Sequence, residues 1–237
     1  MLDFLRYYNR PQKYQAEIQV NVRNTGTEKK QTTVVIPVPM TTDYQITMPL
    51  FEERTLQREL TLAPGHEEIV SIKFEARVQP RRCDPPSGEA GARIREANEF
   101  VLSYLTYGNP IKGLYTAKEA REKKIVDCGG FDTLLQEELK NRGIESKVVA
   151  GFWNTGGMHA WLEINQGPAL VVPADPSVEQ LRRLGRTKKS GQLGFVGSDR
   201  IAFSTWKPGE QFLQHPFVNS DTLVDLNYEN YFFCTRA

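Results

Sequence analysis

The sequence is short of the residues that mark metal sites, disulfide frameworks and membrane spans. Its 237 residues include three cysteines, far apart and without a CxxC pair, so neither a zinc site nor a disulfide framework is expected. No apolar run reaches the length that crosses a bilayer. Positions 1–8 lack the charged and apolar regions of a signal peptide. We therefore expect a cytoplasmic protein with reduced thiols, no metal or cofactor, and no membrane partner.

An excess of charge of one sign is also missing. Lysine and arginine total 30 and aspartate and glutamate total 29, which gives a net charge of +1. Such a chain has no global field that would draw it to nucleic acid, so none is expected as a partner. The composition, 39% hydrophobic and 25% charged, is that of a globular protein. The length allows one large or two small domains and leaves the oligomeric state open.

Alternating apolar and polar residues dominate positions 1–82. Five segments show the alternation or β-branched content of strands, at positions 14–22, 31–38, 44–48, 59–62 and 67–78. Strands that follow one another with short turns are typical of an antiparallel β-sandwich. We predict an N-terminal β-sandwich domain over 1–82, followed by a linker rich in proline that continues to about position 88.

Positions 83–237 have a mixed pattern that predicts an α+β domain. Residues 89–104 repeat apolar side chains at helical spacing. Residues 117–124 are highly charged, which favours a solvated helix face over a binding site. The basic residues 182–189 are interpreted in the same way, as a solvated loop. Many aromatic residues in 205–237 predict that this end packs on the body of the protein, with a strand near 230–234.

Cys128 begins the candidate active site. It stands between Asp127 and two glycines, and the residues after it repeat apolar side chains on one helical face. Cys128 should therefore stand at a helix N-terminus, where free N–H groups and the helix dipole lower the pKa of a thiol. Its own N–H could form half of an oxyanion hole. The alternative is a small buried hydrophobic residue, which is the role expected for Cys83 and Cys234.

A histidine and an aspartate follow at two further turns. His159 opens an alternating run over 159–164, and Asp175 comes after the apolar run 169–172. The turn signal at 165–168 joins the two runs as a hairpin, so the start of the first strand lies beside the end of the second. We therefore predict contact between His159 and Asp175, as a base and its orienting carboxylate require. The alternatives are a buried core histidine and a plain turn aspartate.

Taken together, these motifs resemble the core of the transglutaminase-like superfamily of papain-fold cysteine enzymes. The resemblance covers positions 96–204 and rests on motifs in the family's order, namely Asp127-Cys128-Gly129, Arg142-Gly143-Ile144, Met158-His159-Ala160-Trp161 and Ala174-Asp175-Pro176. It implies a papain-like catalytic domain over 83–237, with Cys128 as nucleophile, His159 as base and acid, and Asp175 as the residue that orients His159.

The sequence departs from this family at one position and leaves another without an assignment. Many family members have a small residue where this chain has Asp132, and a carboxylate one turn after Cys128 could raise the pKa of the thiol. No upstream tryptophan can be assigned as the second oxyanion donor. The first departure weakens the prediction of a reactive thiol, and the second leaves the oxyanion hole incomplete.

The implied activity is acyl transfer at an amide carbonyl of a protein or peptide substrate, through a thioester on Cys128. Water as acceptor makes the enzyme a peptidase or amidase, and a lysine-like amine makes it a transglutaminase. We favour hydrolysis, because the small, polar residues 154–157 would leave the cleft open to water. The alternative from another class is an inactive interaction protein whose β-sandwich binds a partner and whose triad is a relic.

Overall fold

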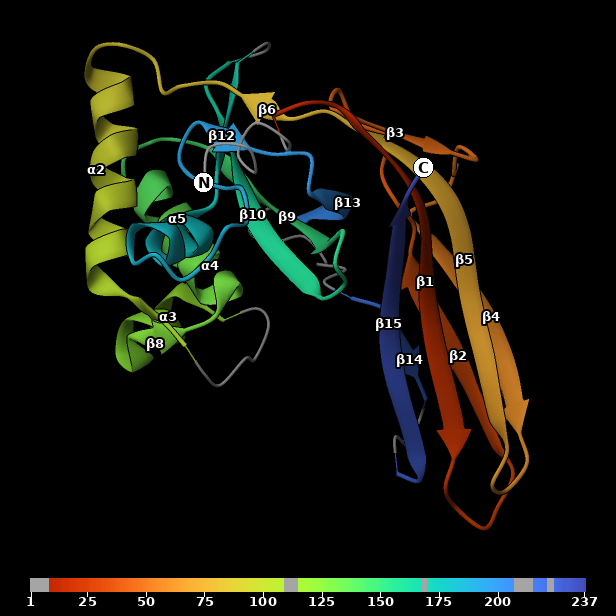
Figure 1. Cartoon of the computed structure of the whole chain (residues 1–237). Helices are drawn as coiled ribbons and strands as arrows, with labels where there is room; N and C mark the ends of the chain where they lie inside the picture. The colour runs from red at the N-terminus through yellow and green to blue at the C-terminus, as the bar shows by residue number, and fades with distance from the viewer. Residues whose placement is uncertain (1–8, 109–114, 168–169, 207–214, 221–223) are drawn as a thin grey trace.

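The protein has an α+β fold that is rich in antiparallel strands. The computed structural model describes residues 9–108, 115–167, 170–206, 215–220 and 224–237. The helices lie together on one side of the molecule, long strands form the other side, and a smaller sheet stands between them (Figure 1). Within the described ranges, no helix is long and apolar enough to cross a bilayer.

Two antiparallel sheets share one hydrophobic core on the strand side. The first has the order β15-β1-β5-β3, and the second the order β14-β2-β4. Their strands are β1 (Gln12–Asn24), β2 (Lys30–Pro37), β3 (Gln45–Met48), β4 (Thr55–Leu62), β5 (Glu67–Val78), β14 (Phe217–Asn219) and β15 (Leu226–Arg236). Alternate side chains such as Ile18, Ile36 and Phe74 point into the shared core, which is why the alternation predicted five of these strands.

The end of the chain supplies the remaining two strands of these sheets. β15 pairs antiparallel with β1 from Asn24↔Leu226 to Tyr14↔Arg236, and β14 pairs with β2. The predicted division assigned 83–237 as a whole to the catalytic unit, whereas β14 and β15 pair within the N-terminal sheets. Positions 168, 169, 207–214 and 221–223, where part of the predicted turn, strand and aromatic tail falls, lie outside the described residues.

The remaining elements build a second unit, in which helices cover a four-stranded antiparallel sheet of order β11-β10-β9-β13. The helices are α2 (Glu89–Tyr104), α3 (Ala117–Lys123), α4 (Cys128–Asn141) and α5 (Pro176–Arg183). The strands are β9 (Ser146–Trp153), β10 (Met158–Asn165), β11 (Val171–Ala174) and β13 (Arg200–Trp206). Short strands complete the unit, in the pairs β6 (Arg81–Arg82) with β12 (Phe195–Val196) and β7 (Thr106–Tyr107) with β8 (Ile125–Val126). The apolar face of α4, including Phe131 and Leu135, packs in one core with Leu162 of β10.

The four-stranded sheet also joins the core of the strand side. Phe152 of β9 and Phe203 of β13 belong to the same hydrophobic cluster as the first two sheets. The ring of Phe152 stacks on Phe232 of β15 with 5.0 Å between centroids. Gly151 allows β13 to approach β9 closely, since a Cβ at this position would lie 2.1 Å from the Ile201 carbonyl oxygen. The sheet that carries His159 is therefore held on both faces.

Candidate active site

Helix α4 places Cys128 at its first residue. Asp127 is the N-cap, and its Oδ1 accepts a hydrogen bond from the Gly130 N–H at 3.3 Å. Gly130 must lack a side chain, because a Cβ there would lie 2.5 Å from the Cβ of Val126. The predicted position of Cys128 at a helix N-terminus is therefore confirmed, and the cap fixes the direction in which the helix begins.

His159 and Asp175 are in direct contact, as the hairpin pattern predicts. His159 Nε2 lies 2.8 Å from Asp175 Oδ2, and both side chains are buried. Asp175 is also the N-cap of α5, where its Oδ1 accepts from the Val178 N–H at 3.1 Å and from Ser177 Oγ at 3.0 Å. The carboxylate is thus fixed at both oxygens, and it fixes the imidazole in turn.

A third side chain, Arg200, completes this buried pair, and the sequence did not predict it. Its Nη1 donates to Asp175 Oδ2, its Nη2 donates to the Ser190 carbonyl, and its Nε lies 3.4 Å from Asp199 Oδ1. Arg200 is 2% exposed. The available signal was the charged pair at positions 199 and 200 directly before an apolar strand, since a buried arginine needs carboxylate partners.

The charges of this cluster set the pKa values of its members. Burial opposes ionisation of Asp175, but His159 and Arg200 outweigh it and hold the pKa of this carboxyl well below its usual range. Burial lowers the pKa of His159 and outweighs the opposite effect of Asp175, with Arg200 and Lys189 adding to the lowering. At neutral pH the pair is therefore a carboxylate and a neutral imidazole, which can accept a proton.

Two tryptophans and a lysine form the wall beside His159. The ring of Trp153 stacks on His159 with 4.2 Å between centroids, and Trp161 follows at 6.2 Å. Lys189 Nζ lies 4.1 Å from the centroid of Trp153. The sequence favoured a solvated loop over 182–189. Lys188 is exposed, as this predicts, but the side chain of Lys189 is half-buried against the indole of Trp153.

The pKa of Cys128 differs from the sequence expectation. Burial raises the pKa of the thiol well above its usual range, ionised Asp132 and Asp127 raise it further, and a hydrogen bond from the backbone of Ala160 lowers it. The expectation that the helix N-terminus would lower this pKa was wrong, because burial and two carboxyls outweigh the helix dipole. The Ala160 bond places the sulfur beside the residue that follows His159. Within the described chain, the thiol makes no hydrogen bond to the imidazole itself.

Asp132 lies one helical turn after Cys128, where the sequence drew attention to it. Its carboxyl is fully buried, and neither oxygen has a hydrogen-bond partner within the described residues. Burial and the charges of Asp175 and Asp127 raise its pKa well above the ordinary value. The site therefore opposes ionisation of this carboxyl, and only its ionised form adds a negative charge beside the thiol.

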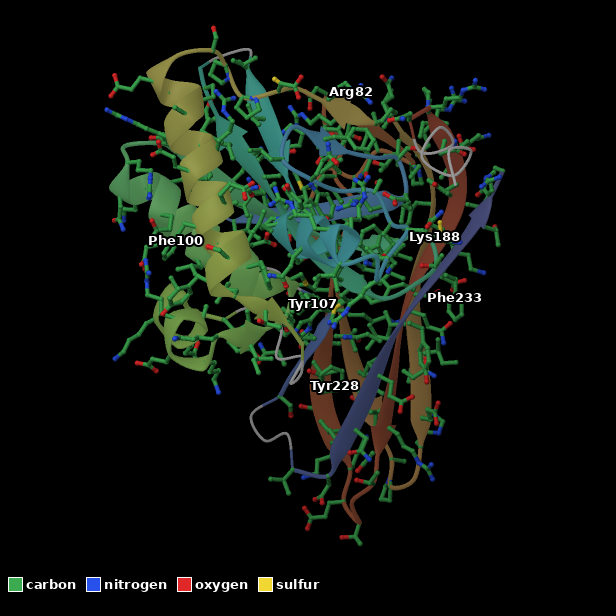
Figure 2. All side chains as sticks on the ribbon, turned by 60° about the vertical axis from the view of Figure 1, so that its left-hand side comes forward. Arg82, Phe100, Tyr107, Lys188, Tyr228 and Phe233 are labelled. Carbon is green, nitrogen blue, oxygen red and sulfur yellow. The ribbon has the colours of Figure 1, made fainter. Side chains whose placement is uncertain are left out.

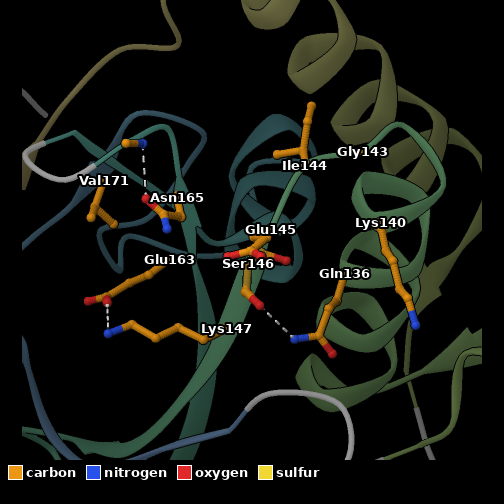
Figure 3. A pocket seen from close by; sticks show the side chains of 11 residues that line it. Gln136, Lys140, Gly143, Ile144, Glu145, Ser146, Lys147, Glu163, Asn165 and Val171 are labelled. Atoms are coloured by element: carbon orange, nitrogen blue, oxygen red, sulfur yellow. Dashed lines mark hydrogen bonds and ion pairs between the residues drawn. The ribbon is translucent and has the colours of Figure 1, made fainter.

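A separate cavity lies along the other end of the same sheet (Figure 3). It has a volume of about 680 Å³, and its lining includes Gln136, Lys147 and Glu163. Glu163 is held by Lys147 at 2.9 Å and by Arg81 at 2.6 Å. None of the predicted site residues lines this cavity. Among the described residues, no group of three or more histidine, cysteine or acidic side chains could hold a metal ion.

Comparison with known proteins shows a relative in fold. The chain superposes on the crystal structure of a "putative cysteine protease" from Cytophaga hutchinsonii with a TM-score of 0.62. The match covers 95% of this chain and 91% of the other, at 11% sequence identity. No family model and no curated protein sequence matches the chain. At this identity the likeness establishes a shared fold, over nearly the whole length of both proteins.

Proposed function

We propose that the protein is a cysteine hydrolase with a papain-like, transglutaminase-like catalytic unit, which cleaves peptide or amide bonds through a thioester on Cys128. The observation that carries this proposal is the buried contact between His159 and Asp175, beside a cysteine that begins a helix. A nucleophile, a base and a group that orients the base are the parts of a catalytic triad. The fold shared with a "putative cysteine protease" supports the same reaction class.

The proposed reaction begins with proton transfer from the thiol. Because Asp175 occupies His159 Nε2, the free Nδ1 is the nitrogen that takes the proton of Cys128 as the sulfur attacks the amide carbon. The new oxyanion is stabilised by the Cys128 N–H. The C–N bond then breaks, and the amine leaves with the proton from His159, which produces a thioester. Water attacks this thioester while His159 takes its proton, and the thiolate leaves and is reprotonated.

The acceptor decides between hydrolysis and transamidation. The turn between β9 and β10 includes Gly156 and Gly157, both with positive φ, and these two residues add no side chain to the turn. Open access favours water because of its bulk concentration. The rings of Trp153 and Trp161, which both stack on His159, favour the transglutaminase alternative, since buried apolar rings exclude water from the base. The buried Asp132 favours the inactive interaction protein, because its ionised form opposes a thiolate.

One experiment separates these readings. The purified protein is incubated with a peptide library, and in parallel with a glutamine-bearing protein and a fluorescent primary amine. Hydrolysis predicts peptide cleavage that is lost in Cys128→Ala and kept in the matched control Cys83→Ala. Amine incorporation without cleavage would replace the hydrolase by a transglutaminase. If neither product forms and circular dichroism shows that the protein is folded, the inactive interaction protein is the remaining alternative.

A further inference from the structure

Lys189 presents an ammonium group at the candidate active site that has no carboxylate partner within the described ranges. Its side chain is half-buried, and its Nζ lies 4.1 Å from the ring of Trp153. Among the residues that the structure describes, no carboxylate lies within ion-pair distance of this nitrogen, although four acidic residues lie in the site, namely Asp127, Asp132, Asp175 and Asp199. A half-buried ammonium loses hydration, and the indole returns only part of that loss.

The neighbouring cation, Arg200, shows what a fully satisfied charge in this site requires. Its guanidinium contacts the carboxylates of Asp175 and Asp199 and the Ser190 carbonyl. Arg200 therefore has a structural role, and its donors are occupied. Lys189 stands over the same indole ring as Arg200, whose Cζ is 4.2 Å from the ring centroid, but without any of these acceptors. Of the two cations, it is the one with donors to offer a ligand.

The loop that carries Lys189 is anchored at the site. Ser190, the next residue, donates from its N–H and Oγ to Asp199 at 2.8 and 2.5 Å. Gly191 covers Asp175, because a Cβ at this position would lie 2.7 Å from its Oδ2. These contacts fix the backbone on the C-terminal side of Lys189. Its ammonium is thereby held beside Trp153, whose ring stacks on His159.

The electrostatic setting agrees with an anion site. Burial and Arg200 lower the pKa of Lys189, whereas Asp199, Asp175 and the thiolate of Cys128 raise it. The ammonium is thus close enough to feel a charge on the reacting sulfur. An arriving carboxylate would supply the partner that this cation lacks, and a charge-assisted bond in a partly dry site is stronger than one in water.

We propose that Lys189 binds a carboxylate of the acyl substrate, so that the enzyme prefers amide bonds next to an acidic group. This inference rests on the proposed function, because it assumes that the substrate is attacked by Cys128. The carboxylate could belong to an acidic side chain or to a free peptide C-terminus, which present the same chemistry. The exposed Lys188, labelled in Figure 2, lies next in sequence but outside this contact, and it therefore provides a matched control.

The test uses two reagents that alkylate thiols by the same reaction but differ in charge. Iodoacetate carries a carboxylate, and iodoacetamide is its neutral analogue. Their rates of Cys128 alkylation are measured by peptide mass spectrometry, and the ratio is normalised to that of Cys83 in the same sample. The proposal predicts a raised ratio for iodoacetate at Cys128 that falls on the order of fivefold to tenfold in Lys189→Met. Lys189→Arg should keep the raised ratio, as should Lys188→Met.

Three outcomes would overturn the inference. The normalised ratio could be the same in the wild type and in Lys189→Met, or Lys188→Met could lower it equally. Lys189→Met could also slow both reagents by one factor, which would mean that the cation stabilises the thiolate and does not bind a carboxylate. Each variant is checked for an unchanged melting temperature, with Lys189→Gln as a second removal of the charge.

The source of the carboxylate is resolved with peptide pairs. One pair differs by glutamate against glutamine beside the cleaved bond, and the other by a free against an amidated C-terminus. In the wild type, the two peptides of one pair should be cleaved at different rates, and this difference in rate should disappear in Lys189→Met. Equal cleavage rates within both pairs in the wild type would contradict the inference. If no peptide is cleaved but the ratio of iodoacetate to iodoacetamide alkylation still depends on Lys189, the proposed hydrolysis is contradicted and the proposed anion site is supported.

Discussion

Arg200 donates to Oδ2 of Asp175, the same carboxylate oxygen that contacts His159 Nε2. The aspartate therefore joins a permanent cation to a titrating imidazole in the interior of the protein. Such a buried pair is costly to break, because removal of one partner leaves an uncompensated charge. The arrangement makes Asp175 a structural residue as well as a candidate for orienting His159.

Replacement of Arg200 by methionine should lower the free energy of unfolding by about 3–5 kcal/mol, since Asp175 and Asp199 would lose their cation inside the protein. Denaturant unfolding at neutral pH measures this. Arg183→Met is the control, because this arginine pairs with Glu99 at the half-exposed surface, where an ion pair contributes about 1 kcal/mol or less. Equal losses in the two variants would contradict the assigned role of Arg200.

Asp175→Asn should cut turnover on the order of 10²-fold or more, because the orientation and tautomer of His159 are lost. A role limited to orienting His159 would leave folding nearly intact, whereas the contact with Arg200 predicts a loss of stability as well. Turnover is therefore measured well below the melting temperature of the variant. An unchanged rate in the folded variant would reduce Asp175 to the N-cap of α5.

Asp132→Asn should make the protein relatively more stable as the pH rises. The pKa of Asp132 in the folded state lies above its unfolded value of about 3.9. Its contribution to stability is therefore fully present below that pH and is lost as the pH rises toward the folded pKa. Asparagine does not titrate, so the gain over wild type should grow by up to about 1.4 kcal/mol per pH unit.

Unfolding curves between about pH 4 and pH 8 measure this gain as a function of pH. The exposed Glu52→Gln serves as a control that should show no such trend. A constant difference between Asp132→Asn and the wild type across this range would mean that Asp132 does not resist ionisation. The buried carboxyl would then need a partner outside the described residues.

Phe232→Ala should destabilise the protein by roughly 2 kcal/mol, less than is typical for a fully buried phenylalanine, because Phe232 is half-buried. Its ring lies 5.0 Å from Phe152 and 6.4 Å from Phe203, so the loss reports contact between β15 and the sheet that carries His159. Phe233→Ala is the matched control, since Phe233 is 49% exposed (labelled in Figure 2) and its removal should change stability by about 0.5 kcal/mol or less.

The sequence predicted those parts of the fold that depend on local pattern. Alternation predicted β1 and β5, helical spacing predicted α2, and a turn signal brought His159 to Asp175. These features need only neighbours in sequence or one hairpin. Whether the three site residues act as a triad stays a prediction.

Long-range pairing could not be predicted in the same way. β15 pairs with β1, from which it is separated by most of the sequence. A local sequence pattern indicates a strand but does not identify the strand with which it pairs. Lys189 enters the site from a segment that the sequence favoured as a solvated loop, and Arg200 enters it as the first residue of β13. The raised pKa of Cys128 depends on burial by distant residues, which sequence spacing does not contain.

The pairing of β15 with β1 has a consequence for synthesis on the ribosome. β1 precedes β15, the strand that covers its edge, by most of the described sequence, so β1 emerges long before its partner. Until β15 has been translated, that edge has open backbone donors and acceptors, which can pair with another chain. Phe152 is translated earlier and lacks its stacking partner, the ring of Phe232, until β15 is made. A nascent chain of this protein therefore remains exposed to aggregation until β15 has left the ribosome and paired with β1.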